Sequence, residues 1–187
     1  MIKPFAADYL ADLKRAIEAL PLDKLEAVYS RILEAARAGR QIFIMGNGGS
    51  GATASHFAAD LNLKAGLRSR NPFRAICLND SLPAILAIAN DHSFAEIFVR
   101  PLKRFLRKGD LVIGLSSSGN SENVLRAIAC ANRAGAGTVG LTGFDGGKLA
   151  RRARLVLVVP ADDCQKVEDL HLVLLHVILQ KLKAEAF

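Results

Sequence analysis

Two pairs of polar residues combine the side chains that carry out acid–base chemistry or bind metal ions. His56 and Asp60 are four residues apart, so both lie on one face of the helix predicted after a glycine-rich loop. Glu168 and His176 are eight residues apart near the end of the chain. At 3.6 residues per turn their directions differ by about 80°, so they can border one pocket. Two imidazoles and two carboxylates predict proton transfer or a zinc site.

Three other titratable residues near these pairs have structural interpretations. His171 points about 140° away from His176 on the same predicted helix, which indicates a core or helix-face histidine. Asp169 falls almost in line with His176, where it would only orient the imidazole. His92 follows Asn90-Asp91 in a predicted loop.

A serine-rich turn at residues 116–121, with the sequence SSSGNS, predicts a phosphate site. The turn follows a predicted strand and precedes a predicted helix, and its hydroxyls are those of Ser116, Ser117, Ser118 and Ser121. Hydroxyl donors, free N–H groups and the positive end of a helix dipole together suit phosphate oxygens. Capping by Ser121 would explain one serine but not four.

A glycine loop at residues 46–51, with the sequence GNGGSG, leads into the helix that carries His56. Its glycines let the backbone approach a ligand closely and leave N–H groups free. The loop also matches the dinucleotide pattern G-x-G-x-x-G, which requires an acidic residue at the end of the next strand, about 20 residues later. Asp80 stands farther along the chain than that spacing. A nucleotide site therefore stays open as an alternative.

These loops are expected at one edge of a doubly wound, five-stranded parallel sheet flanked by helices. Short apolar runs alternate with helical stretches, and the predicted strands are residues 41–45, 75–78, 111–115, 138–141 and 155–159. The runs are apolar almost throughout, as in sheets covered on both faces. Ligands of such sheets bind beyond the carboxyl ends of the strands, near the point where strand order reverses.

The first 40 residues predict two amphipathic helices, because apolar residues recur there at helical spacing. Their apolar stripes must be buried against the same domain or against a partner chain, and we expect this pair to form oligomer contacts.

Length and composition predict a single domain spanning residues 1–187. The chain has 187 residues, 51% of them hydrophobic, which suffices for a full core. The sequence shows neither an apolar stretch of about 20 residues nor a signal peptide, which predicts a cytoplasmic protein. The three cysteines are odd in number and scattered, so they indicate neither disulfides nor a zinc knuckle. The net charge of +7 suits anionic partners, but the basic residues are spread without interleaved aromatic rings, which argues against nucleic acid.

Taken together, the motifs resemble those of the sugar isomerase (SIS) domain proteins and, within them, the phosphoheptose isomerases. The similarity covers nearly the whole chain and rests on residues 46–50, 56–58, 90–91, 109–110, 118–121, 141–148 and 170–176. The resemblance implies an SIS-type, flavodoxin-like fold and a homotetramer with active sites at subunit contacts. It also implies conversion of sedoheptulose 7-phosphate to D-glycero-D-manno-heptose 7-phosphate for surface polysaccharide, often with a divalent metal such as zinc.

Four positions depart from the family pattern. Where that family has glutamate and glutamine in its metal and catalytic set, this chain has Asp60 and Glu168. Lys64 replaces a substrate-contacting arginine, and Gln165 replaces an aspartate near the sugar hydroxyls. Shortening a tightly positioned carboxylate can cost a rate factor of order a hundred. The carboxylate of Glu168 would tighten a bound cation.

The resemblance assigns a role to each site residue. An enediol mechanism would use Asp60 as the base and His176 as the acid that returns the proton. The expected zinc ligands are His56, Asp60, Glu168 and His176. The expected substrate contacts are Ser116, Ser117, Ser118 and Ser121 with the phosphate, and Asn47, Gly48, Gly49, Ser50, Asp91, Lys64 and Gln165 with the sugar and the rest of the substrate.

Two alternatives remain. The four departures make an isomerase of another phosphorylated sugar plausible. A non-catalytic SIS protein is the other alternative, since one relative regulates replication initiation by contacting an initiator protein. That relative lacks the histidine pair, whereas His56 and His176 are both present here, which favours an enzyme.

Overall fold

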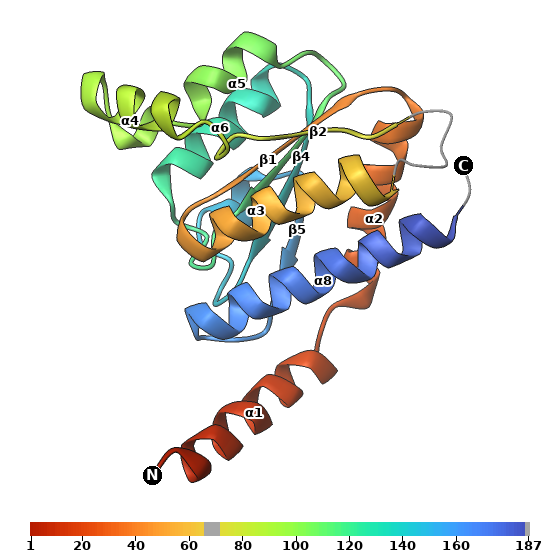
Figure 1. Cartoon of the computed structure of the whole chain (residues 1–187), viewed down its shortest axis with the longest axis vertical. Helices are drawn as coiled ribbons and strands as arrows, with labels where there is room; N and C mark the ends of the chain where they lie inside the picture. The colour runs from red at the N-terminus through yellow and green to blue at the C-terminus, as the bar shows by residue number, and fades with distance from the viewer. Residues whose placement is uncertain (66–71, 186–187) are drawn as a thin grey trace.

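The computed structural model describes residues 1–65 and 72–185, which form a five-stranded parallel sheet with helices on both faces (Figure 1). The strands are β1 (Gln41–Gly46), β2 (Arg74–Cys77), β3 (Leu111–Leu115), β4 (Gly137–Thr142) and β5 (Leu155–Val158), in the order β2-β1-β3-β4-β5. Each predicted strand boundary lies within one residue of the observed one. The predicted doubly wound fold is confirmed.

Buried apolar side chains on both faces explain why these segments form central strands. In β1, Ile42 and Ile44 pack into the core on one side of the sheet, and Phe43 and Met45 pack into the core on the other. All four side chains are fully buried, and burying each contributes about 1.5–3 kcal/mol.

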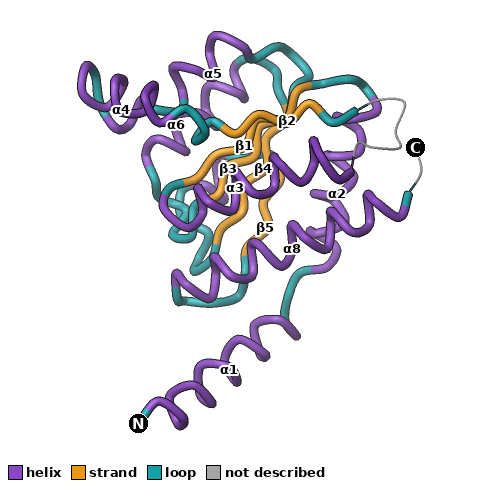
Figure 2. The backbone as a smooth tube through the Cα atoms, in the orientation of Figure 1, coloured by secondary structure: helices purple, strands orange, loops and turns teal. Residues whose placement is uncertain are grey.

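The helices divide between the two faces of the sheet (Figure 2). The first core lies under α2 (Leu22–Arg37), α3 (Gly48–Asp60) and α8 (Cys164–Ala184). The second lies under α4 (Leu82–Asp91), α5 (Val99–Phe105), α6 (Glu122–Arg133) and α7 (Leu149–Arg152). A π-helical turn, η1 (Leu61–Ala65), extends α3, and a 3-10 turn, η2 (Phe94–Glu96), follows α4. α3 and α8 pack against each other, which brings together helices far apart in the sequence.

The first helix, α1 (Ile2–Glu18), projects from the body of the molecule (Figure 1). Tyr9 donates a hydrogen bond to Asp169, and Lys166 pairs with Asp12 at 2.9 Å, so polar contacts join α1 to the start of α8. Both predicted N-terminal helices are present. None of the helices in residues 1–65 and 72–185 has the length and apolar character needed to cross a membrane.

The strand order places the reversal point between β1 and β3. The glycine loop follows β1 and opens α3, and the serine turn follows β3 and opens α6. This order is the flavodoxin-like one and differs from the 3-2-1-4-5-6 order of dinucleotide-binding folds. Asp80 accepts a hydrogen bond from Ser55 at 2.7 Å. The strand order therefore does not match the dinucleotide-binding fold to which the G-x-G-x-x-G pattern belongs.

Candidate active site

Two asparagines hold the glycine loop at the end of β1. Asn79 donates from Nδ2 to the Gly46 carbonyl at 2.7 Å and accepts from the Gly46 N–H at 3.3 Å. Asn47 and Asn123 exchange two amide hydrogen bonds of 3.0 and 2.8 Å, which tie this loop to α6. Sequence reasoning missed Asn79 and Asn123. The sequence signal that could have found them was their position, since Asn79 follows the strand β2 and Asn123 lies in the first turn of α6.

The serine turn is braced from within and from β4. Ser116 is buried and its hydroxyl donates to the Ser121 hydroxyl at 3.0 Å. Ser121 stands at the N-cap position of α6, yet its side chain makes no capping hydrogen bond. The Ser117 carbonyl accepts from the Gly143 N–H at 2.8 Å. Because Ser121 does not cap the helix through its side chain, capping does not explain even this serine.

Glu168 on α8 connects the two loops. Its Oε1 accepts hydrogen bonds from the Ser50 N–H at 3.2 Å, the Ser50 hydroxyl at 3.3 Å and the Ser117 hydroxyl at 3.4 Å. The Ser50 and Ser117 hydroxyls are themselves 3.5 Å apart. The glycine loop and the serine turn therefore form one polar surface with a carboxylate in its centre.

A His–Asp–His cluster, formed by His56, Asp60 and His176, lies farther along α3 and α8. The His56 and His176 Nε2 atoms are 3.4 Å apart. Asp60 Oδ2 is 3.3 Å from His56 Nε2 and 3.8 Å from His176 Nε2. Asp60 is 4% exposed, while both imidazoles are partly open to solvent. The structure thus joins His56 and Asp60 to a histidine 120 residues away.

The cluster has the composition and spacing of a three-ligand zinc site. Its ligand atoms all lie within 4.8 Å of one another. Ligand atoms on a tetrahedral zinc ion, at about 2.0–2.1 Å from the metal, are separated by roughly 3.3 Å, close to the distances found here. Asp60 Oδ2 is buried without a hydrogen-bond partner among the described residues, as expected for an atom whose lone pairs face a cation. These three residues fit a divalent metal.

The structure does not place Glu168 with these ligands, which corrects the prediction that it completes the metal set. The group of possible ligands contains three of the four predicted residues. Glu168 lies two helical turns before His176 on α8. Its carboxylate accepts hydrogen bonds from Ser50 and Ser117 instead of joining the three ligands. In this conformation it borders the serine turn instead of the His–Asp–His cluster.

Comparisons with known proteins agree with the fold. Residues 6–143 match the family model described as the SIS domain. The phosphoheptose isomerase of Aliarcobacter butzleri is 37% identical over 187 residues, which cover 99% of this chain and 96% of that protein. The phosphoheptose isomerase of Helicobacter pylori strain P12 is 37% identical over 166 residues, covering 89% and 85%.

The chain belongs to the phosphoheptose isomerase family of SIS domain proteins. The structure of phosphoheptose isomerase GmhA from Neisseria gonorrhoeae superposes with a TM-score of 0.91 and 28% identity, covering 99% of this chain and 100% of that one.

Among the departures from the phosphoheptose isomerase pattern, Lys64 has a clear structural role. Its Nζ lies 2.7 Å from Asp60 Oδ1, so one carboxylate oxygen meets an ammonium group while the other faces the imidazoles. Lys64 belongs to the π-helical turn η1, and single π turns occur frequently at functional sites. Lys64 was predicted to contact substrate, and in the structure its side chain contacts Asp60.

Asp91 and Gln165 make no contact with the His–Asp–His cluster among the hydrogen bonds and ion pairs of the described residues. Asp91 ends α4 on the opposite face of the sheet, where its carboxylate accepts a hydrogen bond from Asn90 at 2.9 Å. Gln165 is exposed in the first turn of α8.

His171 is a core residue, as predicted. It is fully buried, and its Nε2 lies 3.3 Å from the Thr142 carbonyl oxygen, to which it donates as a neutral ring. Burial lowers the pKa of His171 to about 4, although the hydrogen bond to Thr142 opposes this shift. Asp169 does not orient His176, because it accepts a hydrogen bond from Tyr9 instead.

Proposed function

We propose that this protein is an aldose–ketose isomerase that converts sedoheptulose 7-phosphate to D-glycero-D-manno-heptose 7-phosphate. The observation that carries the proposal is that the serine turn and the His–Asp–His cluster border the same pair of packed helices, α3 and α8. Relatives that match nearly the whole chain carry the name phosphoheptose isomerase.

The two parts of the site are separated by a distance that suits an extended phosphosugar. Ser50 and His56 are six residues apart on α3, or about 9 Å along the helix axis. Glu168 and His176 are eight residues apart on α8, or about 12 Å. A seven-carbon chain with its phosphate at the serine turn would therefore present its first two carbons to the His–Asp–His cluster.

At the serine turn, Ser116, Ser117, Ser118 and Ser121 would donate to the phosphate oxygens, together with N–H groups at the start of α6. The glycine loop (Asn47, Gly48, Gly49 and Ser50) would contact the sugar chain. Binding energy from the phosphate would orient carbons that are several bonds away, where the reaction takes place.

When no metal is bound at the cluster, Asp60 would take the proton from the carbon and His176 would return it. Asp60 Oδ2 and His176 Nε2 are 3.8 Å apart, so both groups can face two neighbouring carbons. Lys64, on Asp60 Oδ1, would keep the carboxylate in one orientation. Zinc or another divalent ion held by His56, Asp60 and His176 would, when bound, stabilise negative charge on the sugar oxygens.

We also propose a homotetramer of single-domain subunits whose active sites lie at subunit contacts. Two observations support it. The apolar face of α1 is exposed, with Phe5 at 66% and Leu10 at 61%. Asp91 and Gln165 lie away from the cluster of their own chain, so a neighbouring subunit would have to bring Asp91 to the sugar.

An isomerase of another phosphorylated sugar is the second candidate. It is favoured by Glu168, which places a carboxylate within 3.4 Å of the Ser117 hydroxyl, where phosphoheptose isomerases are expected to have glutamine. A non-catalytic binding protein is disfavoured by the His56–His176 pair, because a purely binding role gives no reason to bring these imidazoles together on a buried carboxylate.

The test is isomerisation of sedoheptulose 7-phosphate, compared with other ketose phosphates, by the purified protein. The His176→Gln variant should lose at least a hundredfold in kcat, because removal of a general acid–base group costs about 10²–10⁴. Lys183→Gln, an exposed change on the same helix, is the matched control. Near-normal turnover by His176→Gln with an unchanged unfolding temperature would refute the catalytic role.

Metal content is measured separately. His56→Ala should lower the zinc or other divalent ion bound per chain, determined by mass spectrometry of the dialysed protein, and Lys183→Ala should not. Equal metal content in His56→Ala and the unmodified protein would contradict the His–Asp–His site.

A further inference from the structure

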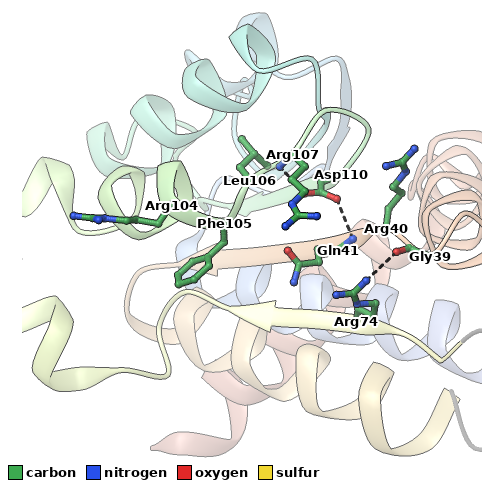
Figure 3. A pocket seen from close by; sticks show the side chains of 9 residues that line it. All are labelled: Gly39, Arg40, Gln41, Arg74, Arg104, Phe105, Leu106, Arg107 and Asp110. Atoms are coloured by element: carbon green, nitrogen blue, oxygen red, sulfur yellow. Dashed lines mark hydrogen bonds between the residues drawn. The ribbon is translucent and has the colours of Figure 1, made fainter.

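A second polar pocket of about 320 Å³ lies at the amino-terminal edge of the sheet (Figure 3). It is bordered by residues at or just before the starts of β1, β2 and β3, namely Gln41, Arg74 and Asp110. The glycine loop and the serine turn follow the opposite ends of β1 and β3. Strands of five or six residues separate the two edges by roughly 15–20 Å. This pocket is therefore distinct from the proposed isomerase site.

The pocket carries a concentrated positive charge that its own residues do not neutralise. Four arginines line it: Arg40, Arg74, Arg104 and Arg107. Its single carboxylate, Asp110, is 4% exposed and accepts the backbone N–H groups of Gln41 at 3.1 Å and Arg107 at 2.7 Å. Across residues 1–65 and 72–185, no salt bridge involves any of the four guanidinium groups.

Two of these guanidinium groups, those of Arg74 and Arg107, lie on either side of the Gln41 side chain (Figure 3). The side chains of Arg40 and Arg104 point away from Gln41. Arg74 is anchored by a 3.4 Å hydrogen bond to the Gly39 carbonyl. Arg40 lies over Gly109, where a methyl group would come within 3.2 Å of its Cζ. The planar fork of arginine matches phosphate oxygens in bidentate pairs, so the guanidinium groups of Arg74 and Arg107 suit two adjacent phosphates.

Phe105 adds a feature that a simple phosphate site does not need. Its ring lines the same pocket and is 59% exposed. An exposed aromatic ring beside guanidinium groups offers a flat face on which a base can stack. The pocket volume lies at the lower end of the range for small-molecule sites, about 300–1,000 Å³.

We propose that this pocket binds a nucleoside diphosphate. Its two phosphates contact Arg74 and Arg107, with Arg40 lining the same pocket, and its base stacks on Phe105. Gln41 supplies a hydrogen-bonding amide between these groups. The ligand occupies the edge of the sheet opposite the serine turn, so it does not compete with the phosphosugar.

The test is calorimetric titration of the full-length protein with ADP, UDP and inorganic pyrophosphate, using sodium sulfate as the reference anion. The nucleoside diphosphates should bind saturably at one site per chain and more tightly than sulfate. The double variant R40Q/R107Q should weaken binding about tenfold or more, because it removes charge-assisted hydrogen bonds to the phosphates. Phe105→Ala should weaken ADP or UDP several-fold and leave pyrophosphate unchanged.

Two controls locate the site. Arg133→Gln changes an exposed arginine that does not line the pocket, and Ser117→Ala alters the serine turn; neither should affect nucleotide binding. The double variant should keep its isomerase activity and unfolding temperature. The proposal is overturned if neither nucleotide binds, if R40Q/R107Q binds as tightly as the unmodified protein, or if Ser117→Ala abolishes binding. Equal losses of ADP and pyrophosphate affinity in Phe105→Ala would overturn the role of base stacking.

Discussion

Glu168 places a negative charge beside the turn that is proposed to bind phosphate. Its Oε1 accepts from Ser50 and from Ser117, the second at 3.4 Å. A glutamine could accept the same hydrogen bonds through its amide oxygen without the charge. The carboxylate therefore repels an incoming phosphate, which glutamine at this position would not do.

The Glu168→Gln variant is accordingly expected to lower the KM for sedoheptulose 7-phosphate by roughly three- to tenfold, since like charges a few ångströms apart near a protein surface repel by a few kcal/mol before screening. Asp169→Asn, the neighbouring position on α8, is the control because Asp169 contacts Tyr9. Steady-state kinetics at low and high salt measure the effect. An unchanged or higher KM would show that the Glu168 charge does not oppose substrate binding.

The buried His171 should make the stability of the protein depend on pH. Burial lowers the pKa of His171 to about 4 in the folded protein, against about 6.5 in the unfolded chain. The unfolded chain then binds more protons, so the contribution to stability is complete above pH 6.5 and is lost as pH falls toward 4. The loss is about 3 kcal/mol at the lower limit.

Chemical denaturation between pH 7 and pH 4, at constant protein concentration, tests this contribution. His171→Gln keeps a donor for the Thr142 carbonyl but does not titrate, so the free energy of unfolding of this variant should fall less steeply with acid. Parallel pH profiles for the two proteins would contradict the prediction.

At the scale of the elements, the serine turn depends on its close contact with the loop after β4. Gly119 has φ +66°, and a Cβ there would lie 2.1 Å from the Gly146 carbonyl oxygen. Gly48 in the glycine loop has φ +52°, but a Cβ there would meet no atom within 4 Å. The two glycines share a left-handed conformation and differ in the space around them.

Comparing Gly119→Ala with Gly48→Ala separates the cost of the left-handed backbone conformation from the cost of the close contact with Gly146. Gly48→Ala should cost about 1–2 kcal/mol, the cost of a left-handed residue with a Cβ. Gly119→Ala should cost clearly more and should weaken phosphate binding, because backbone atoms of the turn must move. Thermal unfolding and phosphate titration measure the two changes. Equal destabilisation by both substitutions would show that the Gly119–Gly146 contact does not brace the turn.

At the scale of the whole molecule, α1 makes little contact with the rest of its own chain. Its exposed apolar residues include Ile2, Phe5, Leu10 and Ile17, and Ala16 is its single buried residue. Burying such a face is worth about 25 cal/mol per Å², so a second copy of the chain is the proposed partner.

Leu10→Asp should therefore shift the assembly toward smaller species, as measured by sedimentation velocity. Ala11→Asp is the matched control, because Ala11 is exposed on α1 about 180° from Ile2 around the helix. Isomerase activity should fall together with assembly if neighbouring subunits complete the site. An unchanged sedimentation coefficient for Leu10→Asp would exclude α1 from the interface.

The sequence determined the features that depend on local pattern. The apolar runs located all five strands, because segments buried on both sheet faces have few polar residues to obscure their limits. Four-residue spacing placed His56 beside Asp60, because one helix turn fixes that relation. The serine turn and the glycine loop were found for the same reason, since strand, turn and helix follow one another directly in the chain.

Only the tertiary structure decided the relations between distant segments. The packing of α3 against α8 sets which residues face each other, and neither helix encodes that alignment by itself. It brought His176 to His56 and Asp60 but placed Glu168 between Ser50 and Ser117. The arginine pocket likewise exists because parallel strands bring their starting residues to one edge, which joins arginines far apart in the chain.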